Sequence, residues 1–306
     1  MMTDGPERDF IGYGPTPPDP KWPGGARLAL NLILNYEEGA EYSILDGDAH
    51  SESMLSEVAA QPLPGERNLN VESSYEYGSR AGVWRILRVF AERQAPLTIY
   101  GVGAALERNP AVAEKTARMG CDYVGHGWRW VEYRNMPEDE EREHIKLCVE
   151  AIERLTGKRP AGWFTGRPSL NTRRLVVEEG GFLYDCDAIN DDLPYWVMVD
   201  GKQHLVICHT FDTNDGRFTR GQGFSTADQW FTYMRDAFDC LYREGETSPK
   251  LLTVAMHCRM IGRPGRISAL TRFLDHVEAH SDVWLCHRDE IARHWHEHHY
   301  GQAALS

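Results

Sequence analysis

The fold is decided by the stretch Leu-Ala-Leu-Asn-Leu-Ile-Leu-Asn-Tyr-Glu-Glu-Gly, which occupies residues 28–39. A nearly uncharged apolar run of this kind predicts a strand that is buried on both faces of a parallel sheet. The strand ends in two adjacent carboxylates, Glu37 and Glu38. Enzymes built as α/β barrels place their chemistry at the carboxyl ends of such strands. These two acids are therefore candidate functional residues, and a solvated acidic turn is the alternative interpretation of the pair.

Strand and helix patterns alternate along the remaining chain. Strand patterns occupy residues 97–100, 121–124, 162–165, 182–184, 204–207, 251–256 and 283–285. Helix patterns occupy residues 79–93, 110–119, 137–157, 172–179, 226–242 and the segment from 289 onward. This alternation predicts parallel βα units, and no linker or repeat divides the chain. We therefore expect one α/β domain, a distorted (β/α) barrel over residues 27–297, with an irregular arm at 1–26, a tail at 298–306 and a long functional loop within 40–77.

Composition limits the classes of partner. The chain has 306 residues, of which 42% are hydrophobic and 26% charged, as in ordinary globular proteins. Its net charge of −13 argues against binding to nucleic acids or to anionic membranes. Seven cysteines, an odd number without a Cys-x-x-Cys pair, favour a reduced compartment. No signal-peptide or membrane-spanning pattern is found, so we expect a cytoplasmic protein with a small intracellular substrate.

Polar side chains follow several of the predicted strands. They are Glu37 and Glu38, His126, Arg167, the aspartate-rich segment 185–192, and His257. In a barrel these strand ends converge on one face. Such a set can hydrolyse a C–N bond, because a carboxylate or histidine takes a proton from water, a cation stabilises the oxyanion, and an acid protonates the departing nitrogen.

The order of these motifs resembles that of the polysaccharide deacetylase family. That family carries an acidic pair after its first strand, a His-x-x-x-His metal motif, an Arg-x-Pro-type motif, an aspartate–tryptophan segment and a late strand that ends in histidine. The matching positions are Glu37-Glu38-Gly39, His126, Arg167-Pro168, the segment 191–196 and His257. The resemblance covers residues 27–295 and implies a barrel of the polysaccharide-deacetylase type.

Longer segments are similar to the allantoinases of this deacetylase fold. They are residues 35–39, 75–82, 171–175, 191–196 and 257–264. This resemblance implies a hydrolase that opens the hydantoin ring of allantoin to allantoate in urate breakdown. It also implies a homo-oligomer that works without a metal. The turn at 166–169 and the segment 125–128 depart from the pattern of that branch, so another hydantoin or an imide remains an alternative substrate.

The family's metal motif is incomplete in this chain. A zinc site normally has three protein ligands and one open position. Glu38 and His126 would supply two, but the position four residues after His126 is Trp130. We therefore expect no cofactor. A divalent metal such as zinc, bound by Glu38, His126 and a third ligand that the sequence does not identify, is the alternative.

Five residues carry the proposed chemistry. Glu37 is expected to be the base that activates water, and Glu38 to orient it or bind a metal. Two neighbouring carboxylates also separate each other's pKa values. His126 is expected to hold the substrate or act as an acid, and His257 to protonate the leaving nitrogen. Arg167 is expected to clamp the catalytic carboxylate or to face the oxyanion, and a buried structural ion pair is the alternative for it.

Further residues are expected to bind the substrate. Arg259 and Arg263 follow His257, and arginine recognises carboxylates such as the one that ring opening creates. Trp128, Trp130 and Trp196 are expected to line the pocket, although aromatic packing beneath a long loop explains the first two equally well.

Three other functions remain open at this stage. The chain resembles true deacetylases, which would act on an N-acetylated sugar, a peptidoglycan or another polysaccharide. Hydrolysis of other hydantoins or imides is a second alternative. An inactive barrel that binds a glycan or a cyclic ligand is the third. The histidine pair His294 and His298 lies one helical turn apart at the end of the chain, and we interpret it as a solvated helix end.

Overall fold

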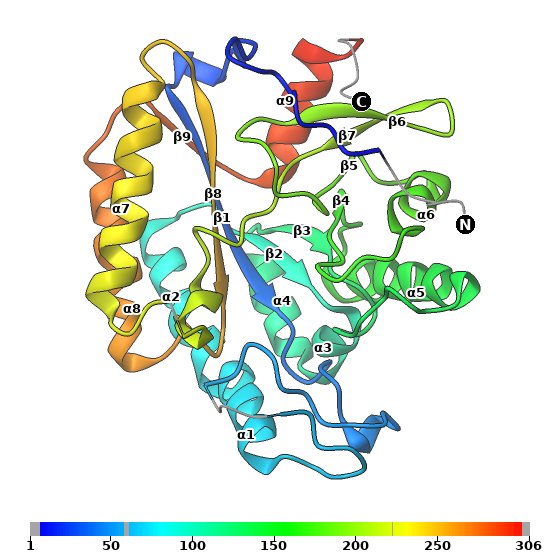
Figure 1. The fold of residues 1–306 in the computed structure, drawn as a ribbon. Coiled ribbons are helices and arrows are strands. Elements are labelled where there is room, and N and C mark those ends of the chain that lie inside the picture. The colour runs from blue at the N-terminus through cyan, green and yellow to red at the C-terminus, as the bar shows by residue number, and fades with distance from the viewer. Residues whose placement is uncertain (1–6, 58–60, 222, 302–306) are drawn as a thin grey trace.

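The computed structural model describes residues 7–57, 61–221 and 223–301 (Figure 1). The strands are β1 (Leu28–Tyr36), β2 (Thr98–Gly101), β3 (Asp122–Gly125), β4 (Gly162–Trp163), β5 (Tyr184–Asp185), β6 (Tyr195–Val199), β7 (Lys202–Val206), β8 (Lys250–His257) and β9 (Val283–Cys286). The α-helices are α1 (Leu69–Tyr77), α2 (Val83–Arg93), α3 (Gly103–Arg108), α4 (Pro110–Arg118), α5 (Glu138–Thr156), α6 (Thr172–Glu179), α7 (Ala227–Glu244), α8 (Pro264–Glu278) and α9 (Arg288–His299).

Strand β1 is the central strand of the sheet, as its apolar sequence predicts. All nine of its residues are buried. One edge pairs with β8 along almost its whole length, and the other edge pairs first with β9 and then with β2. Leu28, Leu30 and Leu32 pack toward the outer helices, whereas Ala29 and Ile33 pack inside the barrel. The strand is therefore buried on both faces.

The sheet curls into a distorted barrel with one incomplete seam. Its order is β6-β7-β5-β4-β3-β2-β1-β8, with β9 added beside β1. All described pairs are parallel except β6 with β7. At the seam, β8 donates hydrogen bonds from Leu251 N to the Asp192 carbonyl and from Ala255 N to the Thr213 carbonyl. The architecture confirms the predicted single-domain α/β fold built as a distorted barrel.

The helices form an outer layer around the sheet. Figure 1 shows α7 and α8 side by side against the face of β1 and β8, with α5 and α6 on the other flank. At the carboxyl ends of β1 and β8, the loop after β1 and helix α1 form a cap. Within the described helices, none has the length and apolar character needed to cross a bilayer.

Three of the elements were not predicted from the sequence. Helix α1 lies within the segment that was predicted as a loop. Its helical periodicity is weak, because Val71 and Tyr75 are its only apolar side chains that face the core. Helix α8 begins at Pro264, directly after the basic loop. Strand β6 has the apolar sequence Tyr-Trp-Val-Met-Val and pairs antiparallel with β7. It was not predicted because its start, Tyr195-Trp196, was assigned to the aspartate–tryptophan segment.

Candidate active site

The two carboxylates after β1 are held by one arginine. The register pairs Asn35 with His257, so Glu37 and Arg259, each two residues further along, emerge side by side. Arg259 Nη2 lies 2.6 Å from Glu37 Oε2, and its Nη1 lies 3.1 Å from Glu38 Oε1. Its Nε donates to the Leu55 carbonyl at 2.8 Å. All three charged side chains are buried, so the arginine holds two carboxylates together in the protein interior.

Two histidines meet the remaining oxygen of Glu37. His126 follows β3, and its Nε2 lies 3.2 Å from Glu37 Oε1. His126 Nδ1 donates to the Phe164 carbonyl at 2.7 Å, which fixes the orientation of the ring. His257 ends β8, and its Nε2 lies 3.5 Å from the same oxygen of Glu37. Glu37 Oε1 thus faces two imidazoles, while Oε2 is bound by Arg259.

A third carboxylate, Asp215, holds His257 in place. His257 Nδ1 donates to Asp215 Oδ1 at 2.6 Å. Asp215 Oδ2 accepts from the backbone N–H groups of His257 at 2.8 Å and Ile261 at 3.0 Å. Asp215 was not predicted from the sequence, because the family's aspartate segment was matched to residues 191–196. Asp215 lies in the segment Asp212-Thr-Asn-Asp215-Gly-Arg-Phe218, and the two aspartates of this segment are the signal that could have identified it.

The charges around the cluster shift the pKa values of Glu37 and His257 in opposite directions. Burial acts to raise the pKa of Glu37, but the charges of Arg259 and His257 hold it well below its usual range. Burial raises the pKa of Glu38, and the nearby charge of Glu37 adds to this effect. Burial acts to lower the pKa of His257, but Glu37 and Asp215 raise it to about 9. At neutral pH, Glu37 is therefore ionised and His257 carries a proton.

Arg167 lies beside this cluster with its guanidinium on an aromatic wall. The guanidinium lies 3.9 Å from the ring centroid of Trp130, and its Nη2 lies 3.5 Å from Glu52 Oε2. That buried Nη2 has no hydrogen-bond partner among the described residues. Arg259, not Arg167, makes the clamp on the carboxylates. Arg167 instead pairs with the buried Glu52, which is the structural ion pair considered as its alternative role. Trp130 packs against both arginines, since Arg259 lies 5.5 Å from its centroid.

Three residues that were predicted to bind the substrate, Trp196, Arg263 and Trp128, contact other parts of the protein. The Trp196 indole is buried and donates to the His299 carbonyl at 2.9 Å, at the end of α9. The guanidinium of Arg263 pairs with Glu57 at 3.0 Å. Trp128 is half-buried and packs against Gly103. The structure thus places the Trp196 indole against α9 and the Arg263 guanidinium against Glu57, and the substrate contacts of both residues stay predictions.

A buried histidine that no motif signalled, His209, lies between this cluster and a cleft. Its ring centroid lies 4.2 Å from that of Phe164 and 5.6 Å from that of Tyr100. Its Nδ1 has no hydrogen-bond partner among the described residues. Burial and the charge of Arg288 hold its pKa well below its usual range, so the ring is neutral.

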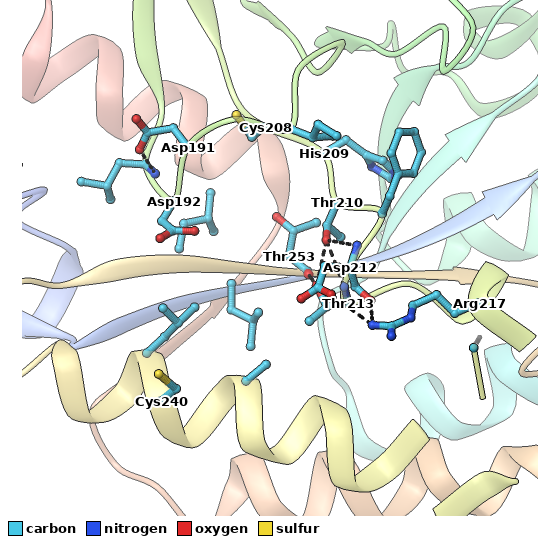
Figure 2. Close-up of a pocket in the computed structure, with 18 of the residues that line it drawn as sticks. Asp191, Asp192, Cys208, His209, Thr210, Asp212, Thr213, Arg217, Cys240 and Thr253 are labelled. Atoms are coloured by element: carbon cyan, nitrogen blue, oxygen red, sulfur yellow. Dashed lines mark hydrogen bonds and ion pairs between the residues drawn. The ribbon is translucent and has the colours of Figure 1, made fainter. Parts of the chain in front are cut away.

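The cleft beside His209 follows the barrel seam and has a volume of about 740 Å³. Figure 2 shows its walls, which come from the segments around Asp191 and Thr210, from α7 and from the first half of β8. Arg217 and Asp212 form an ion pair of 3.1 Å at one end. The described lining residues include His209 but neither Glu37 nor His257.

The donor set does not fit the metal site that the resemblance implies. Trp130 offers no ligand atom at the position of the second histidine. Glu38 uses Oε1 to bind Arg259, and its Oε2 accepts from Glu37 N at 3.1 Å. A guanidinium therefore already neutralises the carboxylates. A metal ion needs several His, Cys, Asp or Glu ligand atoms close together. In the described part of the chain, three such atoms lie within 4.8 Å of one another only at Asp239, His276 and His280, away from this site.

Comparison with known proteins gives three results. The family model "Polysaccharide deacetylase" matches residues 68–179. A "Putative polysaccharide deacetylase" of Schizosaccharomyces pombe is 39% identical over 94% of this chain and 96% of that protein. Two solved structures superpose with a TM-score of 0.93 over 95% of this chain and 98% of theirs. One is described as Puue allantoinase, at 56% identity, and the other as a probable polysaccharide deacetylase from Pseudomonas aeruginosa PAO1, at 55%.

Proposed function

The chain belongs to the polysaccharide deacetylase family, whose members hydrolyse C–N bonds, and we propose that within this family it is an allantoinase. The proposed reaction opens the hydantoin ring of allantoin to give allantoate. The observation that carries the proposal is the pairing of ionised Glu37 with protonated His257. In the same site, Arg259 binds the carboxylate of Glu37, and Trp130 occupies the position of a metal-binding histidine. The structural neighbour described as an allantoinase supports the choice of substrate.

Glu37 is the base in the proposed mechanism. Its Oε1 accepts a hydrogen bond from water, because Oε2 is occupied by Arg259. The water oxygen attacks the ring carbonyl carbon, and its proton passes to Glu37 Oε1. His257 Nε2 then donates its proton to the ring nitrogen as the C–N bond breaks. The products are a carboxylic acid, which releases its remaining proton to solvent and becomes a carboxylate, and a freed ureido nitrogen. The active site is left with a protonated Glu37 and a neutral His257.

The site resets through one direct proton transfer. Glu37 Oε1 and His257 Nε2 lie only 3.5 Å apart. The pKa of Glu37 is held well below its usual range, and that of His257 is raised to about 9. This order of the two pKa values favours the return of the proton from Glu37 to His257, which is the proposed reset. The same ordering ensures that the resting enzyme carries base and acid in their working protonation states.

Arg167 is the proposed donor to the oxyanion. Its buried Nη2 pairs with Glu52 at 3.5 Å but makes no hydrogen bond within the described residues, and the guanidinium packs 3.9 Å from the Trp130 centroid. Donors fixed in advance at a developing negative charge stabilise the transition state without reorganising. His126 is proposed to hold the substrate beside Glu37, since its Nδ1 is committed to the Phe164 carbonyl.

The proposal also covers the compartment, the substrate class, the oligomeric state and the absence of a metal. We propose a cytoplasmic enzyme with a small cyclic amide as its partner, and the seven free thiols are consistent with a reduced compartment. We also propose a homo-oligomer, on the resemblance to the allantoinase branch. No metal takes part in the proposed reaction, since Arg259 supplies the positive charge at Glu37 and Glu38.

Deacetylation of an N-acetylated sugar is the second candidate. It is favoured by the neighbour described as a probable polysaccharide deacetylase, which is almost as similar as the allantoinase. A substrate panel separates the two. Purified protein is assayed with allantoin, hydantoin, succinimide and N-acetylglucosamine oligomers, each with Glu37→Gln as the control. We expect turnover of allantoin that Glu37→Gln abolishes. Acetate release from the oligomers without ring opening would assign the second function, and no turnover at all would leave a binding protein.

A further inference from the structure

The outer helix layer contains a group of ligand side chains that the proposed reaction does not use. Asp239 lies on α7, His276 in the last turn of α8, and His280 two residues beyond the end of α8. One ligand atom from each lies within 4.8 Å of the others. The helices run opposite to the parallel strands, so these helix ends lie beside the strand starts. The group is therefore at the opposite end of the barrel from Glu37.

The hydrogen bonds of His280 already select the right tautomer for a metal ligand. Its Nδ1 donates to the His276 carbonyl at 2.8 Å, because a carbonyl oxygen can only accept. Nε2 is therefore the ring nitrogen that is left to bind an ion. Metal-binding histidines typically donate their other ring N–H to a carbonyl or carboxylate in this way. The contact orients the ring before any ion arrives.

The other two ligands are already in contact. His276 Nε2 lies 2.6 Å from Asp239 Oδ1. In a tetrahedral zinc site with bonds of about 2.0–2.1 Å, neighbouring ligand atoms lie about 3.3 Å apart. The Asp239–His276 spacing of 2.6 Å is shorter than that value, and the spacings to His280 are at most 4.8 Å. A small separation of Asp239 from His276 would admit the ion, which replaces the proton they share.

Aromatic side chains fix the positions of both imidazoles. The ring centroids of His276 and His280 lie 4.8 Å apart. Phe238 places its ring edge-on to both, at 5.3 Å and 5.0 Å, and Tyr242 packs edge-on to His280 at 4.8 Å. The Asp239 side chain is 42% exposed and that of His276 is 23% exposed, so an ion can enter from solvent.

We propose that Asp239, His276 and His280 bind one zinc ion, with water in the fourth position. Two imidazoles and one carboxylate suit a borderline divalent ion such as Zn²⁺ better than Mg²⁺ or Ca²⁺, which prefer oxygen ligands. The ion would join the ends of α7 and α8 and stabilise the folded chain by binding only to it. The site is independent of the proposed function.

The pair His294 and His298 provides a matched control. Their ring centroids lie 4.4 Å apart, one helical turn from each other on α9. His294 Nε2, however, donates to the Pro20 carbonyl at 2.8 Å, so that atom is not available for a metal. His298 is exposed, and replacing it tests whether any surface histidine pair on this chain would bind the ion.

The experiment measures Zn²⁺ binding by calorimetry on the full-length chain, after exhaustive chelation. The variants are Asp239→Asn, His280→Ala and His298→Ala, each checked for folding by circular dichroism and urea denaturation. We expect one equivalent of Zn²⁺ to bind wild type and His298→Ala and to raise their Tm. Asp239→Asn and His280→Ala should each weaken binding at least about tenfold.

Cobalt gives an independent signature in the same proteins. Co²⁺ in a four-coordinate site of nitrogen and oxygen ligands absorbs in the visible range, and we expect this band in wild type and its loss in His280→Ala. The proposal is overturned if wild type binds no Zn²⁺, if either Asp239→Asn or His280→Ala keeps the wild-type affinity, or if His298→Ala loses binding. Because Asp239→Asn keeps the size of a side chain that is 42% exposed, this readout does not depend on His280→Ala folding.

Discussion

At the scale of single residues, Glu37 has two differently used oxygens. Oε2 is bound by Arg259 at 2.6 Å, and Oε1 faces His126 and His257 at 3.2 Å and 3.5 Å. We expect Glu37→Gln to lower kcat by about 10²–10⁴-fold, because the amide cannot take the proton of water. The measurement is steady-state hydrolysis of allantoin.

Glu41→Gln is the matched control for Glu37→Gln. Glu41 is buried near the same strand end, and its Oε2 accepts from Gly39 N at 2.6 Å. Burial raises its pKa to about 7, so a neutral side chain at this position is already compatible with the fold. We expect kcat within about threefold of wild type, since general acid–base effects are much larger than this. Equal activity of Glu37→Gln and Glu41→Gln would remove Glu37 from the mechanism.

The pH profile of the reaction depends on His257. Glu37 and Asp215 raise its pKa to about 9 against the effect of burial, and the proposed acid is active only while protonated. We therefore expect kcat/KM to fall above about pH 9, since this parameter reports the free enzyme. Asp215→Asn removes one negative charge, so the alkaline limb should move to lower pH. The two profiles are compared at fixed ionic strength, and an unchanged limb in Asp215→Asn would contradict the assignment.

The sequence predicted the right residue types at the site but not all of their partners. Both Arg167 and Arg259 follow strand ends, and spacing alone does not show which one reaches Glu37. The pairing of Asn35 with His257 decides it, and register is a property of the sheet rather than of a motif. His209 could not be predicted, because its position depends on its contacts with Phe164 and Tyr100.

At the scale of elements, the loop after β8 is tied to the loop after β1 through Arg259. We expect Arg259→Lys to lower the free energy of unfolding by about 3–5 kcal/mol, because a single ammonium cannot bridge two buried carboxylates. Urea denaturation at pH 7 measures this. The control is Arg263→Lys, whose partly exposed pair with Glu57 should change stability by less than about 1 kcal/mol. Similar losses in both variants would mean that Arg259 does not hold the loops together.

The same loop lies against the π-helical turn Gly78–Gly82 that precedes α2. A Cβ atom at Gly82 would overlap the Cys258 carbonyl oxygen, next to Arg259. We expect Gly82→Ala to cost about 1–3 kcal/mol of stability and to lower kcat, because the loop must shift. Gly265→Ala, in the first turn of α8 with open space around it, should leave both unchanged or raise stability slightly. Thermal denaturation and allantoin assays compare the two variants, and a neutral Gly82→Ala would contradict this account.

At the scale of the whole molecule, alternating apolar and amphipathic segments sufficed to predict one α/β barrel. The apolar run of β1 indicated a strand buried on both faces, and all of its residues are buried. The seam could not be predicted, because β8 closes on the chain through single hydrogen bonds to Asp192 and Thr213 rather than through a strand. The cleft of about 740 Å³ follows from this incomplete closure.

The central claim is that Glu37 and His257 hydrolyse a cyclic amide without a metal. The most direct measurement is the rate of allantoate formation before and after exhaustive chelation, with the metal content of each sample determined. It is made on wild type and on His280→Ala, so that an ion bound at the ends of α7 and α8 is not mistaken for a catalytic one. We expect equal rates in all four samples. Loss of activity on chelation in His280→Ala, with recovery on adding Zn²⁺, would contradict the claim.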